Sequence, residues 1–294
     1  MKKITVILML LCITFGAHAQ ILWKISGKDL PQPSYILGTH HLAPLSIVDS
    51  IADFKQALNS VEQVYGEIVM DDMKNPANMQ KMQQAILLPG DTTLHTLLTP
   101  AQYDSVAVKV KQLMGVDLQM MDKMKPAFLN SQLAVILAMK TVKGFNPLQQ
   151  LDGWVQTEAQ KQGKKVGGLE TMEMQMDVLF GSQSLQRQAE QLYATVMHTA
   201  ETEAVALRLT DAYMNQDLDK IETAMHEKMG NACDALPEEE DKLIYDRNRN
   251  WIKLMPAIMH EHATLFAVGA GHLTGERGVL HLLKELGYKL EAVK

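Results

Sequence analysis

The stretch Ser34–His41, SYILGTHH, decides the fold that we expect for this chain. It is a short apolar run, typical of a β-strand, which stops at Gly38 and places His41 three residues later. Thr264–His272, TLFAVGAGH, repeats this construction near the other end of the chain, with a glycine again three residues before His272. In α/β proteins the functional groups lie just beyond the carboxyl ends of the strands, where ligands bind. If the two strands share a sheet, the two histidines would converge on one site.

The segments around these two strands predict strand–helix–strand units. An amphipathic helix is expected over Ser46–Ser60, and a further strand over Val61–Met70 carries Glu67 near its carboxyl end. Such a crossover is nearly always right-handed and makes its two strands parallel. His41 and Glu67 would therefore emerge at the same edge of the sheet. The C-terminal segment repeats the plan, with a helix and then a last strand over Tyr288–Val293.

The stretch between the two ends, roughly residues 72–260, predicts mainly helix. Lys164–Gly168, KKVGG, is the one short strand candidate in it, and Leu185–Asn215 has apolar residues at helical spacing over a length that favours a break. No low-complexity linker divides the chain. We therefore predict an α/β fold in a single domain, residues 20–294. Its mixed, mainly parallel sheet is formed by the two chain ends, with a large helical insertion between them.

The first 19 residues are typical of a secretory signal peptide. Two lysines precede the apolar run Ile4–Phe15, and Ala17-His18-Ala19 has the A-x-A pattern of a cleavage site. Cleavage after Ala19 would leave a mature chain that begins at Gln20 and is periplasmic or secreted. No other segment is long and apolar enough to span a bilayer, so no membrane anchor is expected in the mature chain.

The net charge limits the classes of binding partner, and the cysteine content excludes an internal disulfide. The formal net charge is −6 at pH 7, and losing Lys2 and Lys3 with the signal peptide changes it from −6 to −8. An acidic chain of this kind is unsuited to nucleic acid or anionic lipid. Cys233 is the one cysteine outside the signal peptide, so the mature chain cannot form an internal disulfide. The sequence does not determine the oligomeric state.

His41, Glu67 and His272 are the candidate metal ligands. The chain has no H-E-x-x-H, no G-x-S-x-G and no P-loop. Two imidazoles and a carboxylate form a known set of ligands for a catalytic divalent ion, which leaves one position open for water. Such an ion lowers the pKa of its water and polarises a carbonyl group.

The motifs SYILGTHH, VYGEI, GLET and AVGAGHLTGERGVLHLL together resemble the TraB/GumN family, which includes the animal Tiki proteins. The resemblance covers essentially the whole mature chain. In that family the paired histidines and the glutamate after the first crossover are the proposed centre of a metal-dependent protease, and they correspond to His41, His272 and Glu67. The animal members are described as manganese- or cobalt-dependent proteases that act on Wnt ligands. The resemblance implies a divalent ion (manganese, cobalt or zinc) but does not carry that substrate over.

Three further family features resemble segments of this chain: an LD pair, a GLE-T segment followed by glutamine, and an R-N pair, which correspond to Leu151-Asp152, Gly168–Thr171 with Gln175, and Arg249-Asn250. Glu170 would then be a fourth ligand or a general base. Alternatively, it is an acid at the start of the following helix. Arg249 would hold a substrate carboxylate or an oxyanion, or else it pairs with Asp246 on the same helix.

We therefore expect a hydrolase of peptide or amide bonds, with a peptide or protein as substrate. Glu170 or Glu67 would take a proton from the metal-activated water, and Arg249 would stabilise the developing negative charge. Two alternatives remain open. One is a metal-free hydrolase with His41 as base, as proposed for the more remotely related erythromycin esterase. The other is a non-catalytic module that binds iron, haem or a secreted partner, on a fold shared with a haem-iron uptake lipoprotein.

Overall fold

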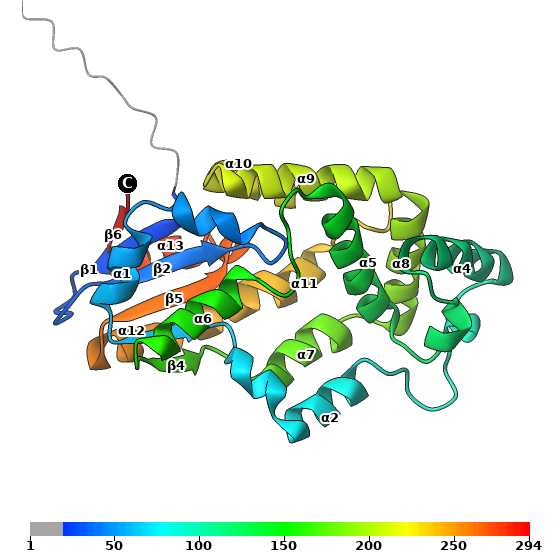
Figure 1. Ribbon diagram of the computed structural model, residues 1–294, viewed down its shortest axis with the longest axis horizontal. Coiled ribbons are helices and arrows are strands. Elements are labelled where there is room, and N and C mark those ends of the chain that lie inside the picture. The colour runs from blue at the N-terminus through cyan, green and yellow to red at the C-terminus, as the bar shows by residue number, and fades with distance from the viewer. Residues whose placement is uncertain (1–19) are drawn as a thin grey trace, which may run out of the picture.

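The computed structural model describes residues 20–294, so the predicted signal peptide lies outside the described residues. Within this range the chain forms one six-stranded sheet in the order β4-β3-β5-β2-β1-β6. The strands are β1 (Leu22–Ser26), β2 (Ser34–Thr39), β3 (Gln63–Gly66), β4 (Lys165–Gly168), β5 (Thr264–Gly269) and β6 (Lys289–Ala292). Figure 1 shows the sheet at one end of the molecule and a group of helices extending from it.

The sheet is mixed, as predicted. The neighbours β4, β3, β5 and β2 run parallel, whereas β1 is antiparallel to both β2 and β6. The expectation that the chain ends alone form the sheet needs a correction. The edge strand β4 comes from the middle of the chain, from the KKVGG segment, and pairs with β3 from Gln63↔Lys165 to Gly66↔Gly168. This pairing brings residues that follow β4 to the same edge as those that follow β3.

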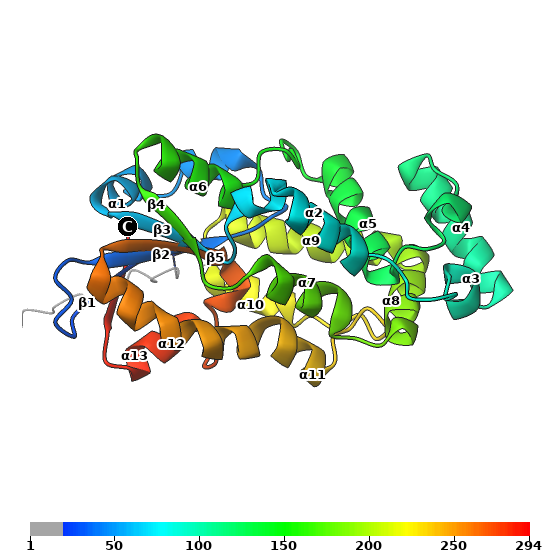
Figure 2. The ribbon, with the colours of Figure 1, turned by 90° about the horizontal axis from the view of Figure 1, so that it is seen from below.

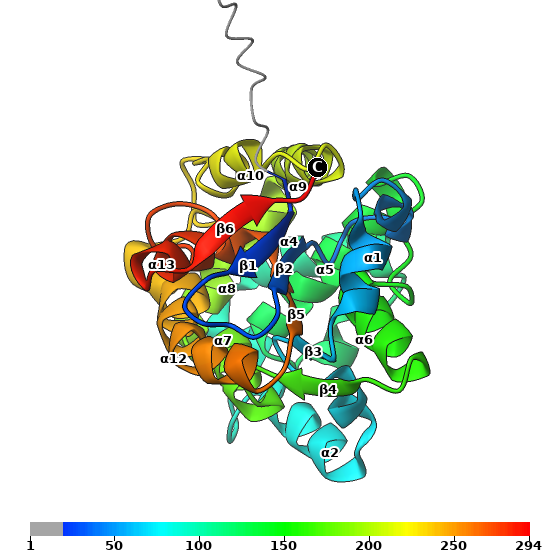
Figure 3. The ribbon, with the colours of Figure 1, turned by 90° about the vertical axis from the view of Figure 1, so that its left-hand side faces the viewer.

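Helices cover both faces of the sheet. Figure 3 shows α1 (Phe54–Ser60) and α6 (Leu151–Lys161) on one face, and α12 (Asp246–Glu261) and α13 (Val279–Glu285) on the other. The central strand β5 is buried from its first residue through Val268. A parallel strand with helices on both sides has no solvated face, which is why this segment is a continuous apolar run and not an alternating one.

The remaining helices form the region away from the sheet, which Figure 2 shows from below. They are α2 (Pro76–Ala85), α3 (Leu94–Leu97), α4 (Pro100–Met114), α5 (Pro126–Thr141), α7 (Met172–Gly181), α8 (Leu185–Met197), α9 (Thr199–Met214), α10 (Leu218–Met225) and α11 (Pro237–Glu240). Short helical turns lie at Leu45–Asp49, Met70–Lys74, Leu118–Met121, Asp241–Tyr245 and Ala270–His272. The long stretch Leu185–Asn215 is broken, because α8 ends at Met197 and α9 begins at Thr199.

Buried side chains form two clusters. The larger one includes Phe266 of β5 and Trp251 of α12, and it joins the sheet to the helices on its two faces. The smaller one lies among α3, α4, α5 and α8 and includes Leu94, Val106 and Leu192. Among the helices of residues 20–294, none combines the length and the hydrophobicity that crossing a membrane requires.

Candidate functional site

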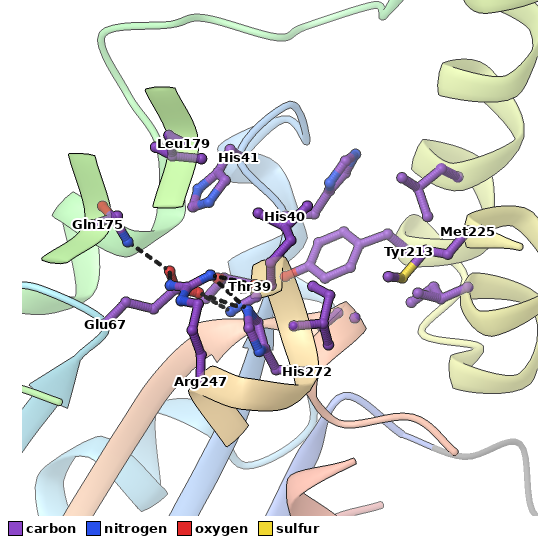
Figure 4. A pocket seen from close by; sticks show the side chains of 17 residues that line it. Thr39, His40, His41, Glu67, Gln175, Leu179, Tyr213, Met225, Arg247 and His272 are labelled. Carbon is purple, nitrogen blue, oxygen red and sulfur yellow. Dashed lines mark hydrogen bonds and ion pairs between the residues drawn. The ribbon is translucent and has the colours of Figure 1, made fainter. Parts of the chain in front are cut away.

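Four neighbouring parallel strands carry predicted site residues to one edge of the sheet. Glu170 follows β4, Glu67 follows β3, His272 follows β5, and His41 follows β2. Because the carboxyl ends of parallel strands meet at the same edge, His41 and His272, 231 positions apart, come to the same edge. His41, Glu67 and His272 line one cavity of about 420 Å³ there (Figure 4).

The glycine in each G-x-x-H segment serves close packing. A Cβ atom on Gly38 would lie 2.9 Å from Cδ1 of Leu273 and 3.0 Å from Cα of Ala270. The turn that carries His272 therefore packs directly against the backbone of β2. A Cβ atom on Gly269 would lie 3.3 Å from Oε1 of Glu67. These contacts draw the strand ends close enough for their side chains to share a site.

Arg247 of α12 links the two glutamates to His272. Its Nη2 donates to Glu67 Oε2 at 2.6 Å, and the same nitrogen contacts Oε1 of Glu170, which also accepts from Nε at 3.0 Å. Its Nη1 lies 3.1 Å from Nε2 of His272 and donates to the Leu243 carbonyl at 3.0 Å. All four charged or ionisable side chains are buried. The guanidinium is therefore the cation around which the cluster is built.

The tautomer of His272 follows from its neighbour Asn248. The Asn248 Nδ2 donates to the carbonyls of His272 and Arg277, so its Oδ1 is the acceptor that faces Nδ1 of His272 at 2.7 Å. Nδ1 must then carry the proton, and Nε2 presents a lone pair to Arg247. Burial, together with the charge of Arg247 and with His41, lowers the pKa of His272 to about 3. The ring is neutral at physiological pH.

The imidazole of His41 is held by a carboxylate, whereas that of His272 is held by the Asn248 amide. Its Nδ1 lies 2.9 Å from Oδ2 of Asp152, at the start of α6, and the Thr39 hydroxyl donates to Oδ1 of the same carboxylate at 2.6 Å. The negative charge of Asp152 raises the pKa of His41 to about 9. This contact was missed from the sequence. The LD pair was noted there, but nothing in it indicates which histidine the aspartate would reach.

The pKa values of the two glutamates that share Arg247 are shifted in opposite directions. Burial alone would raise the pKa of Glu67. The electrostatic interactions of its carboxylate with His272, Arg247 and His41 lower the pKa by more, and the Gly269 N–H, which donates to Glu67 Oε1 at 2.8 Å, lowers it further. The pKa of Glu67 therefore lies below its ordinary value. Burial raises the pKa of Glu170 above its ordinary value despite Arg247. Adjacent carboxylates with opposite shifts are suited to opposite proton-transfer roles.

Arg249 does not lie in this cluster. It is exposed and pairs with Asp246, while Arg247 is only 7% exposed. The sequence at 246–250, DRNRN, contains two consecutive R-N pairs, and the resemblance points to the second. The buried face of α12 could have decided between them. Arg247 stands four residues before Trp251, which begins the buried stripe continued by Met255 and Met259.

The predicted metal ligands fit an ion only in part. Ligands of one ion lie about 3–4 Å apart, given bonds of about 2.0–2.1 Å. Nε2 of His272 and Oε1 of Glu67 are 3.9 Å apart, and each imidazole is fixed through Nδ1, as is usual for metal-binding histidines. His41, however, lies across the cavity on the far side of Arg247 (Figure 4). Within residues 20–294, no three His, Cys, Asp or Glu side chains are grouped to hold an ion.

Comparison with known proteins supports the resemblance seen in the motifs. The model of the TraB/PrgY/gumN family matches residues 21–292. The metalloproteases TIKI2 and TIKI1 of Danio rerio are 24% and 25% identical to the chain, each over 92% of its length. A metalloprotease TIKI homolog of Nematostella vectensis is 24% identical over 93% of the chain and 67% of its own length. The chain spans about 60% of the length of the two Danio rerio relatives. No solved structure matches the chain.

Proposed function

This chain belongs to the TraB/PrgY/gumN family, and from that premise we propose that it is a hydrolase of peptide or amide bonds. We propose that it acts in the periplasm or outside the cell. The single observation that carries the proposal is the buried cluster of Arg247 with Glu67, Glu170 and His272 at the carboxyl edge of the parallel strands. The names of its relatives, which are metalloproteases, favour the same reaction class.

The residues of the cluster take distinct roles in this proposal. Arg247 borders the cavity with a guanidinium held in place by two carboxylates, so it is placed to stabilise negative charge that develops on a substrate oxygen. Burial raises the pKa of Glu170 above its ordinary value, which is the direction that favours proton exchange, and Glu170 contacts the cavity through Arg247. Glu67 stays ionised and fixes Arg247. Arg247 thus takes the role that the sequence suggested for Arg249.

Glu67 and His272 would hold a divalent ion, with His41 as the third ligand expected from the sequence. Manganese, cobalt and zinc are the candidates, and the ion would supply an activated water and a Lewis acid. The protein's own contribution is to keep His272 neutral, through Asn248 and burial, and to keep Glu67 charged. Both are the protonation states that metal ligation requires, whereas His41, with a pKa of about 9, would have to lose a proton to bind the ion.

The test measures cleavage of a peptide library by the purified protein, before and after chelation, together with its metal content. Glu67→Gln and His272→Gln are expected to abolish turnover. Arg247→Lys, which keeps the charge but loses the fork of donors, should lower kcat at least tenfold. Arg249→Lys, two residues away and exposed, is the matched control and should not change it. A folded, metal-loaded protein that cleaves no peptide would overturn the proposal.

One observation favours a second candidate, a metal-free hydrolase with His41 as base, which would work at alkaline pH because the pKa of His41 is about 9. The Thr39–Asp152–His41 chain of hydrogen bonds orients the imidazole from its Nδ1 side, as an aspartate does for a catalytic histidine. This candidate predicts that chelated protein keeps its full turnover and that Asp152→Asn removes it. Loss of turnover on chelation, restored by adding the ion back, would exclude it.

A further inference from the structure

Two hollows open from the cluster, on different sides of it. One is the cavity of about 420 Å³ already described, which Leu209 and Tyr213 of α9 and Met225 of α10 border; we call it the tyrosine hollow. The other, of about 620 Å³, is bordered by Met70, Met73, Met82 and Met176, and by side chains of α5; we call it the methionine hollow. The two share His41, Glu67, Gln175 and Leu179.

The methionine hollow is mainly apolar. Ile68, Ile86, Phe128 and Val135 line it together with the four methionines. Among the described residues that line it there is no lysine or arginine, and its two carboxylates are already engaged by other groups, Glu67 by Arg247 and Asp152 by His41. Methionine side chains are flexible and polarisable, so they adapt to apolar groups of different shape. This hollow is suited to an uncharged, apolar side chain.

The tyrosine hollow is also mainly apolar away from the cluster. Its one arginine, Arg247, is bound to both glutamates, and the hydroxyl of Tyr213 donates to the Gly38 carbonyl at 2.9 Å. The phenol ring, Ile221 and Met225 are among the apolar groups that remain to contact a ligand, together with Leu209, Leu243 and Ile244. Figure 4 shows Tyr213 and Met225 on one side of this hollow and Gln175 and Leu179 on the other.

Helix α7 forms the boundary between the two hollows. Gln175 and Leu179 are four residues apart and therefore project from the same face of the helix. Gln175 Nε2 donates to Glu67 Oε2 at 3.0 Å, which fixes this face against the cluster. Leu179 is 42% exposed, although it is a large apolar residue next to a buried site. A bond held at Glu67 would thus have one hollow on each side of it.

We propose that the substrate is an extended polypeptide segment that places a large apolar side chain in each hollow, on either side of the bond that is cleaved, with Leu179 as the boundary. This inference rests on the proposed hydrolase function. It adds that the site selects the substrate residue on each side of the cleaved bond and that neither of these residues is charged. Peptides without apolar side chains at these two positions are expected to be poor substrates.

The first test compares quenched fluorescent hexapeptides that differ only in the two central residues: Leu-Leu, Leu-Gly, Gly-Leu, Gly-Gly and Asp-Asp. Each replacement of leucine by glycine is expected to lower kcat/KM about tenfold or more, because burial of one leucine side chain is lost. The Asp-Asp peptide should not be cleaved measurably. Equal kcat/KM for Leu-Leu and Gly-Gly would overturn the inference while leaving the hydrolase proposal intact.

The second test separates binding from turnover. The Glu67→Gln protein is titrated with the same peptide sequences, labelled with the fluorophore but without the quencher, and binding is followed by fluorescence anisotropy. Leu-Leu should bind about tenfold or more tightly than Gly-Gly. If no peptide is cleaved by the unmodified protein but this preference in binding remains, the hydrolase proposal fails, and what stands of the inference is that the two hollows bind apolar side chains. If Leu-Leu binds no better than Gly-Gly, the inference is wrong.

The role of Leu179 as the boundary can be tested against a matched control variant. Leu179→Trp should narrow both hollows and reduce the ratio of Leu-Leu to Gly-Gly cleavage about tenfold. Leu207→Trp introduces the same change at a leucine of α9 that is 40% exposed and borders neither hollow, so it should keep the ratio unchanged. Thermal unfolding of both variants checks that they fold. An unchanged ratio in folded Leu179→Trp protein would contradict the assignment of Leu179 as the boundary.

Discussion

Asn248 fixes the protonation pattern of His272. The Nδ1–Oδ1 distance is 2.7 Å, the Asn248 side chain is wholly buried, and its amide nitrogen is used by two backbone carbonyls. A residue that touches no ligand cavity thus determines which imidazole nitrogen faces Arg247 and Glu67. Such supporting partners commonly matter about as much as the groups that they orient.

Replacing Asn248 with alanine should therefore impair the site without removing any group that borders the cavity. We expect kcat/KM and metal affinity to fall about 10–100-fold. The free energy of unfolding should fall by about 1–3 kcal/mol, because buried polar groups lose their partners. Peptide cleavage, metal titration and urea denaturation measure these three quantities. Asn250→Ala, at the exposed position two residues later, is the control. Equal effects of the two substitutions would contradict this role of Asn248.

Arg247 should be a large determinant of stability, and Arg249 a small one. Arg247→Gln leaves two buried carboxylates facing each other without a cation, which typically costs about 3–5 kcal/mol at neutral pH. Arg249→Gln breaks one exposed pair with Asp246 and should change the free energy of unfolding by at most about 1 kcal/mol. Urea denaturation at pH 7 measures both values.

The loss in Arg247→Gln should also depend on pH. Without the cation, the pKa of each carboxyl in the folded variant rises above its unfolded value, so the folded state loses stability as pH rises through the folded pKa. Lowering the pH towards about 5 should therefore recover part of the loss in the variant. A loss that stays constant between pH 5 and pH 8 would show that the charge of Arg247 is not what stabilises the site.

The histidines around the site should give the metal-free protein a stability maximum near pH 6.5. The pKa of His41 is raised from 6.5 to about 9, so its contribution is complete below about pH 6.5 and is lost as pH rises through 9. The pKa values of His40 and His272 are lowered to about 4 and about 3. The unfolded chain then takes up protons first on acidification, and the folded state loses stability below about pH 6.5.

The variant His41→Gln separates the two sides of this pH profile. It should remove most of the fall in stability between pH 6.5 and pH 9. On the acidic side the fall should become smaller but persist, because burial lowers the pKa values of His40 and His272 more than His41 does. The comparison uses urea denaturation midpoints at several pH values with chelator present. An alkaline fall that persists in His41→Gln protein would mean that another group is responsible for it.

Local sequence patterns could predict the strands and the edge at which the site lies, because G-x-x-H segments and a crossover are local features. They could not predict that β4 would pair with β3, since strand pairing depends on contacts between distant segments. The contact from Asp152 to His41 spans 111 positions and has no local signal. A local argument could separate Arg247 from Arg249, because Arg247 lies on the buried stripe of α12 and Arg249 does not.

The glycine of the first G-x-x-H segment gives the sharpest test of how the two chain ends are joined. In Gly38→Ala the added methyl group would lie 3.0 Å from Cα of Ala270, which is backbone and cannot turn aside as a side chain can. The turn that carries His272 must then move away from β2, so we expect a loss of about 1–3 kcal/mol in the free energy of unfolding. Catalytic turnover should also fall, because His272 moves relative to Glu67.

Gly181→Ala, at the end of α7 with no atom within 4 Å of the added methyl group, is the control and should leave both quantities unchanged. Crystal structures or His272 ring NMR shifts would report the displacement directly. A Gly38→Ala protein with unaltered stability and unaltered His272 shifts would mean that the close contact between the two chain ends does not position the site.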